Sequence, residues 1–242
     1  MTDLNTVQSE FVSSVLKLSP RVATFDCDGT LWSGDAGEGF FSWELEKGLV
    51  SQEIVRWARP RYADYRAGNI PEDVMCGEMV TLHRGLREDV VQNAADEYFT
   101  LGVAKNIFPD MRELVRRLRH DGCDVWVVSS SNQWIIRSGM RYFDIPQNRI
   151  LAAEVAVENG TITDRLIRVP SGPGKVEAIR SVLQIPPDCA FGNAIWDREM
   201  LALSKHAFAI NPNSNLKEIA LANHWTVYQP ELNSVPAVVQ QS

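Results

Sequence analysis

The sequence of 242 residues has no long apolar run and no excess of basic residues. No stretch approaches the roughly 20 apolar residues that a membrane-spanning helix needs, so we expect no membrane association. A formal net charge of −7 offers no basic field that would attract nucleic acid. The N-terminal segment lacks the basic and apolar regions of a signal peptide. The composition therefore predicts a soluble globular protein of the cytoplasm.

Cysteine is also scarce, and no two cysteines form a CxxC pair. We interpret the four as scattered reduced thiols, which makes metal binding through cysteine an unlikely role. The sequence contains no internal repeat and no low-complexity segment. These absences leave a single globular chain whose chemistry has to come from polar and charged side chains other than cysteine.

Two carboxylates two residues apart are the most informative feature that is present. Asp26 and Asp28 follow the apolar run at 22–25 and precede a Gly-Thr turn. Because the predicted strand ends here, the carboxylates can converge on one point, where they repel each other unless a cation lies beside them. Mg²⁺ is a hard cation that prefers oxygen ligands. The pair therefore suggests metal-assisted chemistry with an aspartate in the leading role.

The spacing of apolar residues predicts an α/β fold with a helical insertion. A helix at 5–17 and a buried strand at 21–26 come first, and helices follow throughout 33–107, one of them interrupted at Pro60. Beyond this block helices alternate with strands, which we expect at 124–128, 150–157, 161–167, 188–192, 206–210 and 225–228.

This alternation predicts a doubly wound, mainly parallel, Rossmann-like sheet with helices on both faces. The core would comprise residues 1–32 and 108–242, and residues 33–107 would form an all-helical cap. In such sheets ligands bind beyond the carboxyl ends of the strands. Besides the aspartate pair, Ser129 ends a predicted strand, Lys175 opens a helix after a glycine-rich loop, and Asn193 and Asp197 follow another strand.

Four motifs built on these residues resemble those of the haloacid dehalogenase superfamily, and most closely its phosphoserine phosphatase-like subgroup. They are the DxDGT motif at 26–30, the serine motif at 127–129, the lysine motif at 172–175 and the acidic motif at 192–197. All four occur in the family order, and the resemblance extends over about residues 20–230. It implies hydrolysis of a small phosphorylated metabolite, a phosphate monoester, and Mg²⁺ as cofactor.

The resemblance also implies a role for each residue. Asp26 would attack phosphorus and form an aspartyl-phosphate, and Asp28 would protonate the leaving oxygen and later activate water. Ser129 would hold the phosphoryl oxygens, and Lys175 would offset the negative charge. Mg²⁺ would be held by Asp26, the carbonyl of Asp28 and the acidic motif.

The acidic motif departs from the family at Asn193, where an aspartate usually binds the metal directly. An amide oxygen can still coordinate Mg²⁺, but it brings no charge, so we expect weaker metal binding. Asp197 is the alternative ligand, directly or through water. The departure also leaves open a homologue that binds without catalysing.

The substrate is less defined by the sequence. Asp35 and Glu38 are placed to bind an amine, and Ser130 is a further candidate for substrate contact. Phosphoserine phosphatases also use a cap arginine for the carboxylate, and nothing in the spacing selects one of five candidates: Arg56, Arg59, Arg61, Arg66 and Arg84.

Three tryptophans, Trp32, Trp134 and Trp196, each follow a catalytic motif closely. They could pack core against cap, or Trp32 and Trp196 could line the substrate site as part of a cage for an organic cation such as choline. A phosphocholine-type phosphatase therefore remains an alternative to a phosphoserine-like one.

Overall fold

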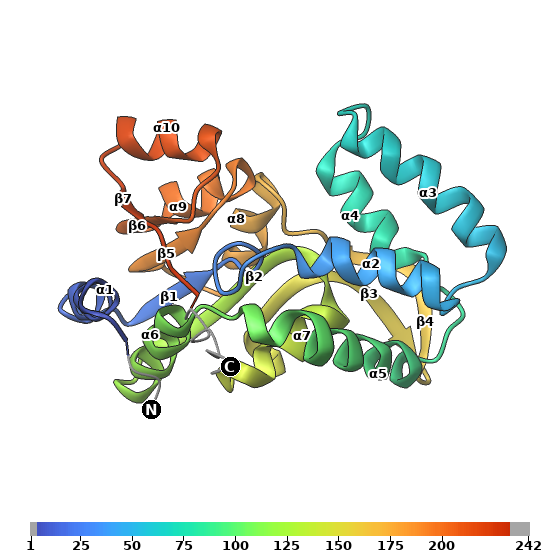
Figure 1. Cartoon of the computed structure of the whole chain (residues 1–242), viewed down its shortest axis with the longest axis horizontal. Helices are drawn as coiled ribbons and strands as arrows, with labels where there is room; N and C mark the ends of the chain where they lie inside the picture. Colours follow the sequence, from blue (N-terminus) through green and yellow to red (C-terminus); the bar gives the residue numbers. More distant parts are fainter. Residues whose placement is uncertain (1–3, 233–242) are drawn as a thin grey trace, which may run out of the picture.

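The computed structural model describes residues 4–232, which form a seven-stranded sheet covered by helices (Figure 1). The strand order is β4-β3-β2-β1-β5-β6-β7, and every neighbouring pair is parallel except β3 and β4. The strand bounds are β1 Val22–Phe25, β2 Asp124–Asn132, β3 Ile150–Glu158, β4 Thr161–Arg168, β5 Cys189–Gly192, β6 His206–Ile210 and β7 Thr226–Tyr228. The predicted α/β class and the mainly parallel sheet are confirmed.

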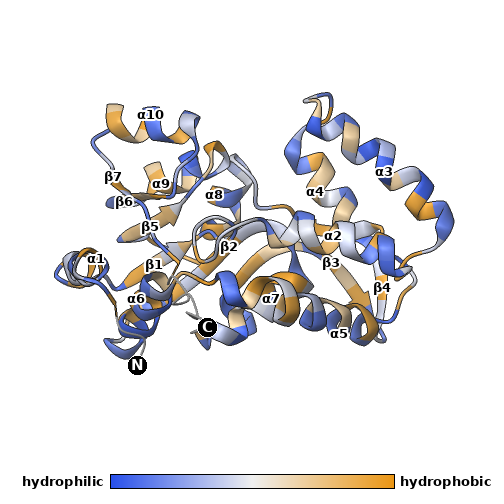
Figure 2. Ribbon diagram, viewed as in Figure 1, coloured by the Kyte–Doolittle hydropathy of each residue, from blue (hydrophilic) through white to orange (hydrophobic). Residues whose placement is uncertain are grey.

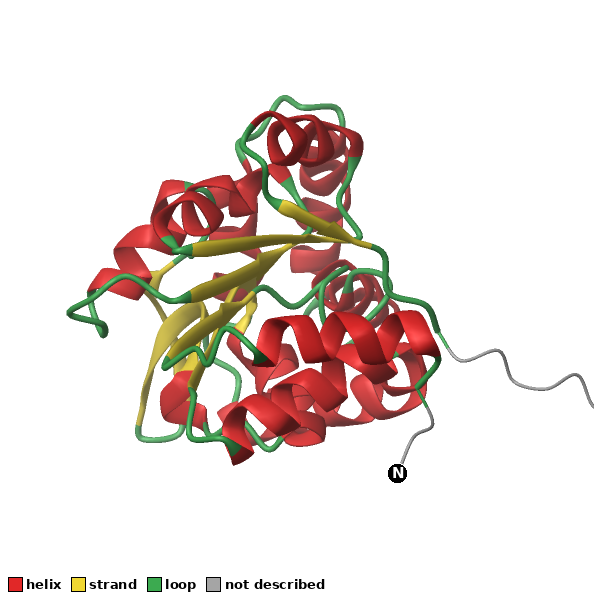
Figure 3. Cartoon of the chain, turned by 90° about the vertical axis from the view of Figure 1, so that its left-hand side faces the viewer, coloured by secondary structure: helices red, strands yellow, loops and turns green. Residues whose placement is uncertain are grey.

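Helices cover both faces of the sheet because apolar side chains of its central strands point to both sides (Figures 2 and 3). Phe25 and Val127 belong to an apolar cluster with α1, α5, α6 and α7, whereas Trp126 and Val128 pack with α8, α9 and α10. The helix bounds are α1 Thr6–Leu16, α5 Glu88–Tyr98, α6 Pro109–His120, α7 Gln133–Met140, α8 Pro173–Arg180, α9 Arg198–Leu203 and α10 Ser214–Ala222. Burial on both faces explains why β1 reads as an uninterrupted apolar run.

The helical insertion lies between β1 and β2 and has two differently packed parts. Helices α2 (Ala36–Lys47), α3 (Gln52–Arg66) and α4 (Glu72–Thr81) share an apolar cluster of their own, which includes Phe41, Ala58 and Met75. Helix α5 packs beside α7 and contributes Val91 to the main core (Figure 1), to which α2 adds Phe40 and α4 adds Val80. The limits of a separate cap at 33 and 107 therefore stay a prediction.

One expectation about the insertion was wrong. Helix α3 continues through Pro60 to Arg66, although Pro60 was expected to interrupt it. Proline removes one backbone donor from a helix, and tertiary packing can compensate for that loss. Here Val55 and Ala58 of α3 are buried in the cluster of the insertion. Among residues 4–232, no helix is both long and apolar enough to cross a membrane.

Candidate active site

The four sequence motifs meet at the carboxyl edge of the sheet. Strand β1 lies between β2 and β5, so the residues that follow these three strands become neighbours. A cavity of about 420 Å³ opens there. Its lining includes every residue predicted to act in catalysis or metal binding: Asp26, Asp28, Ser129, Lys175, Asn193 and Asp197.

Lys175 connects two carboxylates at the floor of this cavity. Its Nζ donates to Oδ1 of Asp26 at 2.7 Å, to Oδ1 of Asp197 at 2.5 Å, and to the carbonyl oxygen of Val128 at 2.9 Å. The three donor protons of the ammonium are thereby used. Thr30 adds a hydrogen bond from its hydroxyl to Oδ2 of Asp26 at 3.0 Å. This network holds Asp26 in one orientation toward the cavity.

The charges in this network shift the pKa values of its members. Burial, followed by the negative charge of Asp197, raises the pKa of Asp26 to about 6, although Lys175 works in the opposite direction. Burial alone would lower the pKa of Lys175, but its two carboxylate partners outweigh that effect and raise it. Lys175 is therefore a permanent cation, and Asp26 is mainly an anion at neutral pH.

Asp28 lies in a different environment from Asp26. Its Oδ1 accepts hydrogen bonds from Nε1 of Trp32 at 2.7 Å and from the backbone N–H of Ala36 at 2.6 Å. The Ser131 hydroxyl donates to Oδ2 at 2.7 Å. Burial and then the nearby Asp35 carboxylate raise the pKa of Asp28 to about 8.

The hydrogen bonds of Asp28 indicate where its proton resides. An N–H group can only donate, so Oδ1 has to stay unprotonated, whereas a hydroxyl can reverse its role. When Asp28 is neutral, Oδ2 therefore carries the proton and can donate it to Ser131 or to a group in the cavity. Asp28 thus combines the two properties of a general acid, a proton at neutral pH and a fixed direction for it.

The three consecutive serines have separate positions on an irregular end of β2, where the pairing with β3 shifts between Val128 and Asn132. Ser129 is buried and its Oγ accepts the backbone N–H of Ser131 at 3.2 Å. Ser130 also lines the cavity. The α7 helix is capped by Asn132, not by a serine. Sequence reasoning missed the contact of Ser131 with Asp28, because no motif pairs these two residues.

Asn193 approaches the backbone next to Asp28. Its Nδ2 lies 1.9 Å from the point where Gly29 would carry a Cβ, so only glycine at position 29 permits this contact. Gly29 also has a φ of +72°, a conformation that residues with side chains rarely adopt. The Asn193 amide, the Asp26 carboxylate and the adjacent Asp28 carbonyl make a donor set of oxygens, which fits a hard divalent cation.

Asp197 is committed to other partners. Its Oδ2 accepts the backbone N–H groups of Asn193 and Ala194, both at 2.9 Å, and its Oδ1 accepts Lys175. These bonds occupy both lone pairs of Oδ2 and one of Oδ1. Asp197 thus orders the loop that presents Asn193, while its role as a metal ligand stays a prediction.

The insertion forms the roof of the cavity with Asp35, Glu38 and Arg66. Asp35 caps α2 by accepting the backbone N–H of Glu38 at 2.7 Å. Arg66, at the end of α3, lies 3.5 Å from Oε2 of Glu38. Of the five candidate arginines, Arg66 is the one that lines the cavity. A separation of 28 positions from Glu38 explains why sequence spacing could not select Arg66.

Of the two roles considered for the three tryptophans, packing applies to Trp32 and Trp134, and no cage of the three forms. Trp32 and Trp134 are fully buried, and Trp32 packs edge-on against Phe99 with 5.1 Å between the ring centroids. Trp32 therefore contributes to the site through its hydrogen bond to Asp28, and the prediction that its ring binds substrate was wrong. Trp196 is 44% exposed and does line the cavity.

Comparison with known proteins agrees with this geometry. Residues 23–202 match the family model of haloacid dehalogenase-like hydrolases. The chain therefore belongs to this family, and membership implies a divalent metal. A histidinol-phosphatase of Neisseria meningitidis is 25% identical over 86% of this chain and 97% of its own length. A probable phosphatase of Mycobacterium tuberculosis is also 25% identical, over 86% of this chain and 76% of its own.

Solved structures share the fold. A protein of unknown function from Bordetella pertussis Tohama I superimposes with a TM-score of 0.74 at 20% identity, covering 86% of this chain and 97% of its own. A substrate-bound phosphoserine phosphatase gives a TM-score of 0.59 at 15% identity, covering 88% and 93%. At this level of identity the likeness concerns the fold alone. The shared fold agrees with the family match of residues 23–202.

Proposed function

We propose that this member of the haloacid dehalogenase-like hydrolases is a Mg²⁺-dependent phosphatase that cleaves a small phosphate monoester through an aspartyl-phosphate on Asp26. The observation that carries the proposal is the contrast between two neighbouring carboxylates in one cavity. Asp26 is held as an anion by Lys175, whereas Asp28 has a pKa raised to about 8 by burial and by Asp35. A nucleophile and a proton donor are thus present at the same pH.

In the first half-reaction, a carboxylate oxygen of Asp26 forms a bond to phosphorus while the bond from phosphorus to the ester oxygen breaks. Asp28 gives its Oδ2 proton to that oxygen, and the alcohol leaves. In the second half-reaction, water attacks the same phosphorus, Asp28 takes a proton from the water, and the bond to Asp26 breaks. Inorganic phosphate is released, and both aspartates return to their initial protonation states.

The residues around phosphorus would stabilise the transferred group. Lys175 supplies a fixed positive charge, and Ser129 supplies a buried hydroxyl beside it. Asp26, Asn193 and the Asp28 carbonyl would hold Mg²⁺, which supplies charge neutralisation for the phosphoryl oxygens. Because these residues are ordered by Asp197, Thr30 and Ser131, little reorganisation is needed when substrate binds.

Two other classes are less well supported. A dehalogenase needs no acid for its leaving group, so the raised pKa and the oriented proton of Asp28 would serve no step of its reaction. Asn193 suggested a homologue without catalysis. Against it, Lys175 contacts the nucleophile Asp26, and hydrogen bonds orient the proton donor Asp28. The three-tryptophan cage that suggested a phosphocholine substrate does not form within residues 4–232.

The roof supports phosphoserine as the first substrate to test. Arg66 could bind its carboxylate, since the side chain lines the cavity and its pair with Glu38 is exposed. Histidinol phosphate is the second candidate because a relative carries that name over nearly its whole length. It has no carboxylate, so Arg66 would be dispensable for it. Hydrolysis of phosphoserine should therefore depend on Arg66, whereas hydrolysis of histidinol phosphate should not.

The test is phosphate release from 4-nitrophenyl phosphate, phosphoserine and histidinol phosphate, with Mg²⁺ and with a chelator. Asp26→Asn should lower kcat by about 10⁴-fold, because the amide is not a nucleophile. Activity that survives this substitution would refute the mechanism. Arg66→Ala should raise the KM for phosphoserine about tenfold, the order expected for one charge-assisted contact. Arg59→Ala, on the same helix but outside the cavity lining, is the matched control.

A further inference from the structure

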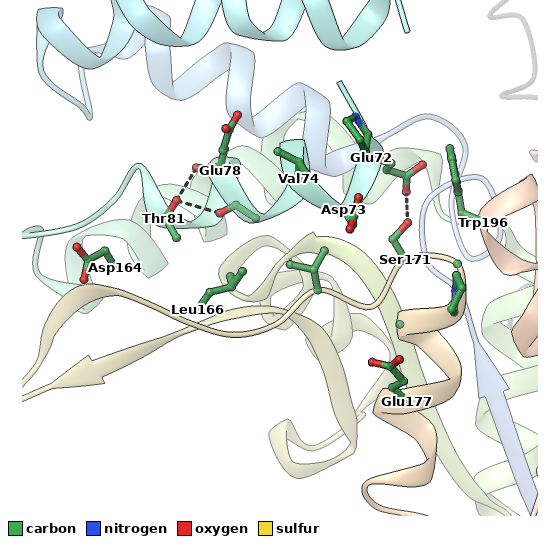
Figure 4. Close-up of a pocket in the computed structure, with 16 residues that line it drawn as sticks. Glu72, Asp73, Val74, Glu78, Thr81, Asp164, Leu166, Ser171, Glu177 and Trp196 are labelled. Carbon is green, nitrogen blue, oxygen red and sulfur yellow. Dashed lines mark hydrogen bonds between the residues drawn. The ribbon is translucent and has the colours of Figure 1, made fainter. Parts of the chain in front are cut away.

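A second cavity of about 860 Å³ adjoins the catalytic one (Figure 4). Helix α4 of the insertion forms one wall, and the segment from β4 into α8 forms the other. Trp196 lines both cavities. The second wall includes Ser171 and Gly174, which directly precede the catalytic Lys175. A group attached to a phosphate at Asp26 therefore has a neighbouring space into which it can extend.

The charged side chains lining this second cavity are all acidic. Two of them are already neutralised, since Glu78 forms an ion pair with Arg61 at 2.7 Å and Asp164 forms one with Arg84 at 2.8 Å. The other three have no basic group within 4.0 Å among residues 4–232: Glu72, Asp73 and Glu177. Asp73 and Glu177 therefore leave negative charge uncompensated beside a site for an anionic phosphate. Burial raises the pKa of Glu72 to about 7, so this carboxyl group is ready to ionise when a cation binds beside it.

Glu72 is the most informative of these residues because it is both buried and incompletely satisfied. Only 6% of it is exposed. Its Oε1 accepts the Ser171 hydroxyl at 3.1 Å, while Oε2 is buried and has no hydrogen-bond partner among the described residues. Figure 4 shows the carboxyl group pointing toward the Ser171 hydroxyl, on the side of the cavity where Trp196 lies. A buried carboxylate oxygen without a partner is costly, so a ligand that donates to it would be stabilising.

Trp196 offers the second element of a cation site. Its side chain is 44% exposed and lies at the junction of the two cavities. The face of an indole ring attracts organic cations. A metal ion is a poorer fit, because no group of three or more His, Cys, Asp or Glu side chains within residues 4–232 is arranged to hold one.

We propose that this cavity binds a positively charged amine or imidazolium on the alcohol part of the substrate, through Glu72 and Trp196. The proposal rests on the proposed phosphatase function, because a phosphate at Asp26 places the cation. The acids of the roof are less suited to this role. Asp35 already caps α2, and Glu38 already faces Arg66, whereas Glu72 has no cationic partner. The preferred substrates are thus phosphate esters of cationic alcohols.

The test compares ω-aminoalkyl phosphates of two to six carbons with n-alkyl phosphates of the same number of heavy atoms. We expect the amine to raise kcat/KM at least tenfold at one chain length. Glu72→Gln keeps the acceptor for Ser171 and removes the charge, and it should reduce this preference to below threefold while n-alkyl phosphates change less than twofold. Glu218→Gln, on α10 and outside the cavity, should leave the preference intact.

A second variant keeps the test decisive if Glu72→Gln does not fold. Glu177 is exposed on α8, so Glu177→Gln should fold normally, and it should lower the preference two- to fourfold. A preference below twofold at every length, or one that neither variant changes, would overturn the proposal.

Calorimetric binding of both series to Asp26→Asn separates this proposal from the proposed function. A binding preference without turnover by the unmodified protein supports the cation site and rejects the phosphatase. Turnover of both series without a preference rejects the cation site and keeps the phosphatase. The expected result is turnover together with a binding preference of at least tenfold that Glu72→Gln abolishes.

Discussion

The floor and the roof of the catalytic cavity differ in how their charges are neutralised. On the floor, the side chains of Lys175 and Asp197 are each 2% exposed and lie in direct contact. In the roof, the ion-paired side chains of Arg66 and Glu38 are 64% and 39% exposed. Solvent and salt screen exposed pairs strongly and buried pairs weakly. The ion pairs of the floor therefore keep their partners when substrate binds. In the roof, Arg66 can leave Glu38 and bind a charged group of the substrate instead.

Among variants that keep the nucleophile Asp26, the largest effect should come from removing the shared cation of the floor. Lys175→Met leaves the buried carboxylates of Asp26 and Asp197 without a cation, which we expect to cost about 3–5 kcal/mol of unfolding free energy. We also expect kcat to fall by about 10³-fold, because fixed charge at the phosphoryl group is lost. Urea unfolding and phosphate release measure the two effects. Lys205→Met is the control, since the Lys205 side chain is 58% exposed in its pair with Asp188. An equal loss of stability there would contradict the difference between buried and exposed cations.

The pH dependence of kcat/KM should reflect the ionisation of Asp26 and Asp28. Activity needs Asp26 ionised and Asp28 protonated, and their pKa values are raised to about 6 and about 8. The rate kcat/KM should therefore rise with pH up to about 6, stay level, and fall about tenfold per pH unit above about 8. Asp28→Asn should remove the upper limb. A profile whose upper limb persists in that variant would assign the limb to another group.

Restoring charge at the metal site should have a moderate effect. Asn193→Asp adds a negative charge beside Asp26, and we expect the Mg²⁺ concentration at half-maximal occupancy to fall about tenfold. Calorimetric titration of the protein without substrate measures this directly. Asn211→Asp, also on the cavity lining, controls for a general increase in negative charge. If Mg²⁺ affinity rises equally in both variants, Asn193 is not a metal ligand.

The smallest effect on catalysis should come from a buried pair inside the insertion. Glu44 and His83 are fully buried and lie 2.6 Å apart, and burial raises the pKa of Glu44. Glu44→Gln retains a hydrogen-bonding side chain, so we expect a loss of about 1–3 kcal/mol in stability and less than a twofold change in kcat. Thermal unfolding and 4-nitrophenyl phosphate hydrolysis test this. Glu46→Gln, exposed on the same helix, should change neither.

The floor was predictable to a greater extent than the roof. Asp26, Ser129, Lys175 and Asn193 were selected because they follow strands or open a helix, and parallel strands bring such positions together. The partners Thr30 and Ser131 were missed because hydrogen bonds depend on side-chain orientation, which strand order does not specify. The burial of Trp32 was missed for the same reason: aromatic residues near a motif can face either the cavity or the core.

By itself, the sequence determined the alternation of strands and helices, the order of the four motifs and the presence of Asn193 in the acidic motif. Local periodicity and turn residues carry that information. Only the tertiary structure decided that Lys175 joins two carboxylates, that Arg66 reaches the cavity and that Glu72 has no ion-pair partner within residues 4–232. These features depend on contacts between residues far apart in the chain. The strand order creates the first, and packing of the insertion against the core creates the other two.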